Sequence, residues 1–203
     1  MVITQYGGPN GELGASLRYL SQRYTMPDEV SKGLLTDIGT EELAHLEIVG
    51  SLVAQLSKNA PPKEWSEMGS WEYYSDNGAS VFPQSSQGSP FNAASIAVTG
   101  DPLTNLYEDL AAEQKARAVY DNILKLSDDP DVNKVIKFLR QREVVHFQRF
   151  GEAILTHSNR FGGYIACVKM QFIDIENYKF LLEILLLINV SRGCGHIFGL
   201  LKE

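Results

Sequence analysis

Two Glu-x-x-His pairs lie in the middle of helical apolar stripes, and this feature restricts the folds open to the chain more than any other. Residues 28–58 carry apolar side chains at steps of three and four residues, the spacing of one helix face. Glu42 and His45 fall on that face, one turn apart, between Ile38 and Val49. A carboxylate and an imidazole therefore point where a core-facing helix normally places apolar side chains.

Polar residues interrupt the apolar stripes of three other expected helices. Residues 130–155 repeat the first arrangement, with Glu143 and His146 in the middle of the stripe. The two remaining expected helices each carry one carboxylate on the apolar face, Glu113 in one and Glu12 in the other. The sequence thus predicts one polar layer to which all four helices contribute.

The charge of this layer indicates a metal site. Burying an unpaired carboxylate costs several kcal/mol. Arg117 lies one turn from Glu113, but the stripes around Glu42 and Glu143 carry no basic residue. A pair of divalent metal ions would balance the charge and explain the histidines, and oxygen plus imidazole donors suit manganese or iron. One Glu from each of two helices and Glu-x-x-His from each of the other two is typical of di-iron and di-manganese proteins.

Several other polar residues have ordinary interpretations. Most isolated Glu and His residues on helices are solvated, and we interpret Glu41 and Glu47 in this way because they lie off the stripe. Tyr19 is predicted to pack in the core with a hydrogen bond. His157 and His196 are expected to be surface or tail residues.

The order of the expected elements predicts the fold class. Helices are expected at residues 10–24, 28–58, 102–126 and 130–155, with a long stretch at 60–101 between the second and the third. The aromatic residues of that stretch indicate an ordered crossover that covers a bundle. Two helices, a long crossover and two more helices predict an all-α, ferritin-like four-helix bundle.

Local signals place the ends of these helices and their close contacts. Asn10 is predicted to cap the first helix, and Asp129, which precedes a proline, to cap the fourth. Gly33, Gly39 and Gly50 lie inside the second helix, where they either weaken it or allow a neighbouring element to approach closely.

Composition excludes several other classes of protein. A length of 203 residues predicts a single main domain, and a net charge of −7 disfavours nucleic acid or an anionic membrane as partner. Cys167 and Cys194 have no CxxC spacing, which argues against a disulfide framework or a cysteine zinc site and for a reducing compartment. No secretory signal is expected, and the apolar run at 180–190 is too short to cross a bilayer.

Four segments resemble the manganese catalase family, and within it the short spore-coat branch of endospore-forming bacteria. In chain order they are QYGGPNGELGASLRYLSQRYTMP, GLLTDIGTEELAHLEIVG, VTGDPLTNLYEDLAAEQKARAVYDNIL and LRQREVVHFQRFGEA. The resemblance covers about Ile3 to Ala153. It implies a domain at 1–155 that is short at its N-terminus, followed by a divergent tail at 156–203 of unknown structure.

The resemblance also assigns roles to residues of this sequence. It implies five metal ligands: Glu12, Glu42, His45, Glu113 and His146. Glu42 corresponds to the carboxylate that bridges the two metals. Glu143 corresponds to a catalytic carboxylate that stands beside the metals and handles protons. The cofactor implied is two manganese ions per chain, with iron as the alternative because the ligand types alone do not separate the two metals.

The function implied is the conversion of two hydrogen peroxide molecules to dioxygen and two water molecules. Two alternatives stay open: a structural spore-coat protein with an impaired or vestigial metal site, and a di-iron ferritin-like oxidase. The resemblance further implies a homo-oligomer, other spore-coat proteins as partners, and a location in the cytoplasm or the spore coat. Neither nucleic acid nor a membrane is an expected partner.

Overall fold

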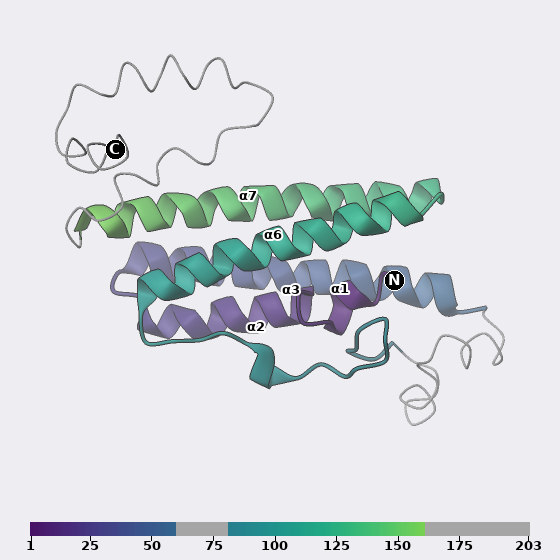
Figure 1. Cartoon of the computed structure of the whole chain (residues 1–203), viewed down its shortest axis with the longest axis horizontal. Helices are drawn as coiled ribbons and strands as arrows, with labels where there is room; N and C mark the ends of the chain where they lie inside the picture. The colour runs from purple at the N-terminus through teal and green to yellow at the C-terminus, as the bar shows by residue number, and fades with distance from the viewer. Residues whose placement is uncertain (60–80, 161–203) are drawn as a thin grey trace, which may run out of the picture. The chain divides into compact units, whose positions relative to one another are not determined.

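A computed structural model describes residues 1–59 and 81–160, and this part of the chain is helical (Figure 1). Its elements are α1 (Thr4–Gly7), α2 (Glu12–Gln22), η1 (Arg23–Thr25), α3 (Glu29–Ser57), η2 (Ala93–Ser95), α6 (Pro102–Leu126) and α7 (Pro130–Arg160). The only strand-like pairing in these two ranges is an isolated bridge between Gln84 and Pro90. The all-α prediction is confirmed.

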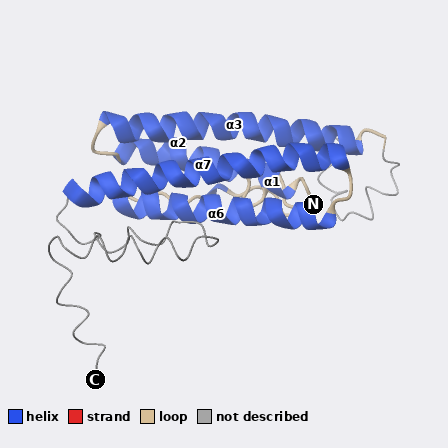
Figure 2. Ribbon diagram, turned by 90° about the horizontal axis from the view of Figure 1, so that it is seen from above, coloured by secondary structure: helices blue, strands red, loops and turns tan. Residues whose placement is uncertain are grey.

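The chain divides into two compact units, Met1–Ile154 and Leu155–Glu203, and the helix bundle belongs to the first. Within that unit α2, α3, α6 and α7 lie side by side along a common direction (Figure 2). Their core residues show that α2 is antiparallel to α3, that α6 is antiparallel to α7, and that α3 and α6 run the same way. Two consecutive helices that run the same way need a connection about as long as the bundle, so the predicted ferritin-like bundle with a crossover between its second and third helices is confirmed.

Aspartates cap three of the four long helices. The side chain of Asp28 accepts a hydrogen bond from the Ser31 backbone N–H at 2.9 Å and so begins α3. Asp101 caps α6 in the same way. Asp129 accepts from the N–H groups of the first turn of α7, as predicted.

Two predicted helix ends need correction. The predicted cap Asn10 lies outside α2, because Gly11 occupies the cap position and the helix begins at Glu12. The backbone packs tightly there, since a Cβ on Gly11 would lie 2.7 Å from the carbonyl oxygen of Gln5. The fourth helix ends at Arg160 instead of near residue 155.

The glycines of α3 differ in their surroundings. A Cβ on Gly39 would lie 2.8 Å from Leu20 Cγ on α2, and one on Gly50 would lie 2.8 Å from the Tyr6 ring. A Cβ on Gly33 would meet no atom within 4 Å. Of the two predicted alternatives, the close approach of a neighbouring element is therefore confirmed at Gly39 and Gly50, whereas at Gly33 only the local weakening of the helix is left.

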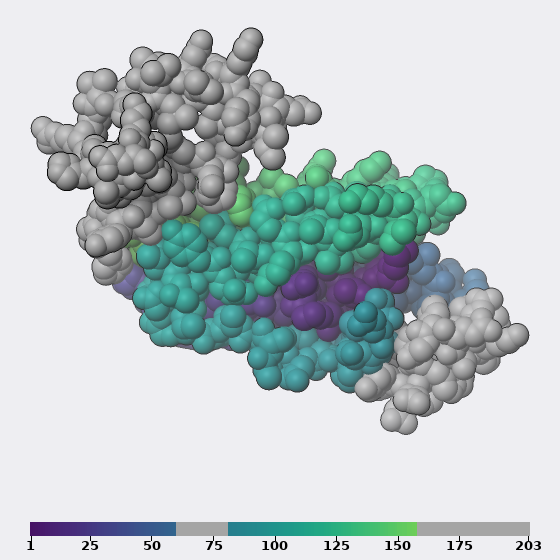
Figure 3. All heavy atoms as spheres, viewed as in Figure 1, coloured from purple at the N-terminus to yellow at the C-terminus, as the bar shows by residue number. Residues whose placement is uncertain are grey.

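The described part of the crossover, 81–101, packs against the N-terminal elements. Figure 3 shows the N-terminal residues, in purple, between this segment and α6. Gln22 donates to the carbonyl of Ala97 at 2.9 Å, and the Ser86 N–H donates to Thr4 at 2.9 Å. This segment therefore lies against α1 and α2, while the aromatic patch at 64–74, which was predicted to cover the bundle, lies outside the described residues.

No helix in the described ranges is both long enough and apolar enough to cross a membrane. Cys167, Cys194, His196 and the apolar run at 180–190 lie outside these ranges, as does most of the tail predicted at 156–203.

The α6–α7 hairpin repeats the α2–α3 hairpin at a constant offset of 101 residues. The offset relates the caps Asp28 and Asp129, which begin α3 and α7. It also relates buried pairs along these two helices: Leu35 with Ile136, Ile38 with Leu139, Val49 with Phe150, and Val53 with Ile154. Residues near the axis of such an approximate twofold repeat lie next to their own equivalents.

Candidate metal centre

A buried polar layer separates the hydrophobic core into two clusters. One cluster includes Leu35, Leu110 and Phe150, and the other includes Val49 and Leu139. Between them lie six residues that are each at most 2 % exposed: Glu12, Glu42, His45, Glu113, Glu143 and His146. All six are the residues that the interrupted stripes placed in the core. The prediction that they are buried together is confirmed.

Glu42 lies at the centre of this layer, between the two histidines. Its Oε2 is 2.8 Å from His45 Nδ1, and its Oε1 is 2.7 Å from His146 Nδ1. The two imidazole rings are stacked with their centroids 5.5 Å apart. One carboxylate therefore reaches both halves of the repeat, as a bridging ligand would.

Glu12 and Glu113 occupy equivalent positions on either side of the centre. Glu12 Oε2 is 3.8 Å from His45 Nδ1, and Glu113 Oε2 is 3.5 Å from His146 Nδ1. Each carboxylate thus pairs with the histidine of one half of the repeat. The Nδ1 atoms and the carboxylate oxygens converge on the same interior space.

Two tyrosines hold these outer carboxylates through hydrogen bonds that cross the bundle. Tyr19 of α2 donates to Glu113 of α6, and Tyr120 of α6 donates to Glu12 of α2. The hydrogen bond predicted for Tyr19 is confirmed, and its ring packs edge-on against Phe150 at 5.0 Å between centroids. The sequence analysis did not assign a role to Tyr120, although it lies seven residues after Glu113, as Tyr19 lies after Glu12.

Glu143 occupies a different place from its repeat equivalent, Glu42. Its Oε1 is 3.9 Å from His45 Nδ1, so it stands to one side of the central carboxylate. Burial, together with the charges of Glu12 and Glu113, raises the pKa of Glu143 well above its usual range. A protonated carboxyl group is thereby favoured beside the centre.

The four carboxylates of the layer attract protons to the site. Burial and the carboxylates of Glu12 and Glu113 raise the pKa of Glu42 to about 8. Burial opposes a charge on the two histidines, but the surrounding carboxylates raise the pKa of His45 to about 10 and that of His146 to about 11. In the absence of another cation, protons are thus retained at the site at neutral pH.

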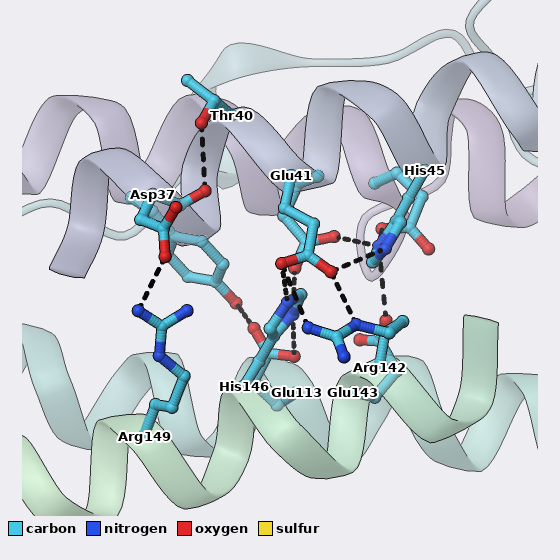
Figure 4. Close-up of polar contacts among 12 residues, drawn as sticks. Asp37, Thr40, Glu41, His45, Glu113, Arg142, Glu143, His146 and Arg149 are labelled. Atoms are coloured by element: carbon cyan, nitrogen blue, oxygen red, sulfur yellow. Dashed lines mark hydrogen bonds and ion pairs between the residues drawn. The ribbon is translucent and has the colours of Figure 1, made fainter. Parts of the chain in front are cut away.

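Glu41 is a correction to the sequence analysis, which interpreted it as a solvated surface residue. Its side chain is 28 % exposed and contacts both imidazoles, as the dashed lines in Figure 4 show. Glu41 Oε1 is 3.5 Å from His45 Nε2, and Oε2 is 3.2 Å from His146 Nε2. Arg142 of α7 donates to the same carboxylate at 2.6 Å. Burial opposes the charge, but Arg142 and His146 lower the pKa of Glu41 to about 2.

His157 is a second correction, because it is 1 % exposed and not a surface residue. Its position near the end of α7 follows the apolar stripe beyond the predicted end of that helix. Because the helix was predicted to end near residue 155, the burial of His157 was not predicted.

The donor atoms of the layer fit a metal pair. Ligand atoms of Glu42, His45, Glu143 and His146 all lie within 4.8 Å of one another. Four buried atoms of the layer face other charged atoms without forming a well-aligned hydrogen bond: Glu42 Oε1, Glu113 Oε2, Glu143 Oε1 and His146 Nδ1. Buried polar atoms are normally satisfied, and oxygen plus imidazole donors suit manganese or iron.

Comparisons with known proteins agree with this interpretation of the site. The family described as manganese containing catalase matches residues 1–170. The chain is 52 % identical over 153 residues to Protein CotJC of Bacillus subtilis. This match covers 75 % of this chain and 80 % of CotJC. It is 39 % identical over 150 residues to a probable manganese catalase of Clostridium acetobutylicum, covering 74 % of this chain and 67 % of the relative.

Solved structures give the same result. The manganese catalase KatB from Anabaena superposes with a TM-score of 0.69 at 30 % sequence identity. The match covers 81 % of this chain and 75 % of KatB. The common fold therefore includes the bundle that carries the polar layer.

Proposed function

The chain belongs to the manganese-containing catalase family, and on that basis we propose that it disproportionates hydrogen peroxide at a pair of manganese ions. The observation that carries the proposal is the buried layer of four carboxylates and two histidines, whose donor atoms converge and in part form no well-aligned hydrogen bond. Such a concentration of buried negative charge is costly unless a cation balances it. The ligands we assign are Glu12, Glu42, His45, Glu113 and His146.

These residues divide into a shared ligand and two terminal sets. Glu42 reaches both histidines, which supports its role as the bridging carboxylate. Glu12 with His45, and Glu113 with His146, would each complete the shell of one ion. Tyr120 and Tyr19 hold the two terminal carboxylates in place, because each donates a hydrogen bond to one of them.

Bound manganese would supply the two-electron redox change that peroxide disproportionation requires. The protein's own task is to move protons. The peroxide molecule that is oxidised to dioxygen releases two protons, and the one that is reduced to two water molecules takes up two. Glu143 stands beside the ligands, with its Oε1 3.9 Å from His45 Nδ1, so we assign its carboxyl group to hold a proton between these two half-reactions.

Manganese is proposed over iron because of the family alone, since both metals accept these donors. A di-iron oxidase is therefore the second candidate for the same site. We further propose, from the resemblance to the spore-coat branch and the similarity to Protein CotJC, that the protein functions in the spore coat as a homo-oligomer. A purely structural coat protein would have no need of this donor set.

The test uses the full-length chain, freed of metal and then loaded separately with Mn(II) and Fe(II). We expect two manganese ions per chain and release of dioxygen from peroxide, measured with an oxygen electrode. Glu42→Ala and His146→Ala should abolish both metal binding and oxygen release. Glu47→Ala is the matched control, because Glu47 is an exposed glutamate on the same helix. Oxygen release with iron alone, or full activity of Glu42→Ala, would refute the assignment.

A further inference from the structure

The repeat places residues of opposite charge at one pair of equivalent positions beside the metal centre. Glu41 precedes Glu42 on α3, and Arg142 precedes Glu143 on α7. Arg142 donates to both carboxylate oxygens of Glu41, from Nε at 2.6 Å and from a terminal nitrogen at 3.3 Å. Equivalent residues in direct contact lie at the axis of the repeat. At this axis a single side chain is equally near to both histidines.

Each histidine lies between an inner and an outer carboxylate. On the inner side, Glu42 faces both Nδ1 atoms at 2.8 and 2.7 Å. On the outer side, the two oxygens of Glu41 face the two Nε2 atoms, one each, at 3.5 and 3.2 Å. Figure 4 shows the contacts of the Glu41 carboxylate with both imidazoles and with Arg142 as dashed lines. One carboxylate therefore serves histidines that come from two different helices.

We propose that Glu41, which faces both Nε2 atoms, is a positioning residue that accepts the Nε2–H of His45 and of His146 when the metal pair binds, and so directs both Nδ1 lone pairs at the metals. This inference rests on the proposed metal site. The hydrogen bond at one ring nitrogen decides which nitrogen of a histidine is free to bind a metal. Because one carboxylate fixes both rings, the two metal ions depend on a single side chain.

Arg142 holds the Glu41 carboxylate in place. Two parallel N–H···O contacts fix the plane of the carboxylate as well as its position. Arg142 also balances the charge of Glu41, so the pair adds no net charge to the layer. This neutrality makes it possible to separate orientation from charge by changing both residues together.

Four variants and the wild type distinguish these effects, with Mn(II) alone as the probe. Glu41→Ala removes both acceptors. Glu41→Gln keeps one acceptor oxygen but turns an NH2 donor toward the other imidazole. Glu41→Gln with Arg142→Gln makes the same change without altering the net charge. Glu47→Gln removes the charge of an exposed glutamate on the same helix and is the matched control.

Loss of a carboxylate that supports a metal-bound histidine typically weakens metal binding about 10- to 100-fold. We expect Glu41→Ala to weaken both manganese equivalents by such a factor. We expect Glu41→Gln to weaken one equivalent much more than the other, and so to split one binding step into two. The double variant should behave like Glu41→Gln, and Glu47→Gln like the wild type. The electron paramagnetic resonance spectrum should then show single Mn(II) ions in Glu41→Gln at stoichiometries where the wild type shows a coupled pair.

Wild-type affinity for both equivalents in Glu41→Ala and Glu41→Gln would overturn the proposal. Recovery of full affinity in the double variant would also overturn it, because net charge would then explain the loss. If Glu41→Ala does not fold, Glu41→Gln decides the question. Oxygen release is measured separately on the wild type: two bound manganese ions without oxygen would refute the catalase function alone, whereas no manganese binding would refute both proposals.

Discussion

Replacing Gly39 by alanine tests the contact between α2 and α3, and Gly33 provides a control on the same helix. Alanine in place of glycine inside a helix favours the folded state by about 1 kcal/mol. Gly33→Ala should show this gain in full, since its new methyl group meets no atom within 4 Å. At Gly39 the methyl group would lie 2.8 Å from Leu20 Cγ and 3.3 Å from the Leu20 backbone nitrogen.

Leu20 must move to admit this methyl group, and extra atoms in a packed site cost about 1–3 kcal/mol. Gly39→Ala should therefore be less stable than Gly33→Ala by that amount. For a chain of this size the difference corresponds to about 2–12 °C in the unfolding midpoint. The assay is thermal and urea unfolding of metal-free protein followed by circular dichroism, because bound metal would add its own stabilisation. Equal midpoints for the two variants would refute the close approach of α2 and α3.

Three further predictions concern the tyrosine, the helix cap and the titration of the site. Tyr120→Phe removes the donor to Glu12 and should lower the free energy of unfolding, measured in urea, by about 1.5–3 kcal/mol. Tyr107→Phe, on the exposed side of the same helix, is the control and should change this free energy little. Equal losses in the two variants would contradict the prediction. Asp101→Ala should destabilise by about 1 kcal/mol through loss of the α6 cap, whereas Asp101→Asn should not. Because the pKa values of His45 and His146 are about 10 and 11, both hold protons at pH 7 that Mn(II) must displace. The apparent affinity for Mn(II) should therefore rise from pH 6 to pH 8. Calorimetry in two buffers of different ionisation enthalpy measures the protons released on binding. An affinity that does not change with pH would contradict the prediction.

The buried polar layer was predictable because it interrupts a strong periodic signal. A helix stripe is a local property of the sequence, so each of Glu42, His45, Glu143 and His146 is marked by its own apolar neighbours. The start of α7 was predictable for the same reason, because the capping residue Asp129 is a local signal in the sequence. Long helices with capped ends depend little on information from elsewhere in the chain.

Glu41 was missed because its surroundings depend on a second helix. It lies one position before the stripe residue Glu42, where a single helix considered alone directs a side chain toward solvent. In the folded chain α7 lies alongside α3, and Arg142 and the two imidazoles surround the carboxylate. The offset of 101 residues is the signal in the sequence that relates Glu41 to Arg142.

The start of α2 shows a different limit. Asn10 has a good capping side chain, but the chain around Gly8 and Gly11 turns too tightly for a helix to begin there. The close packing of Gly8 and Gly11 against the backbone of α1 decides this boundary, and the capping preference of Asn10 alone does not reveal it.

The crossed tyrosine bonds have a consequence for which alignment of the helices is stable. Apolar residues above and below the polar layer would tolerate a slide of one helix along another, because hydrophobic packing is not directional. A shift of one turn moves a side chain about 5.4 Å. Such a shift of α6 along α2 would separate Tyr19 from Glu113 and Tyr120 from Glu12 in one step. The polar layer thereby fixes the alignment of the two hairpins along the bundle axis, even before any ion binds.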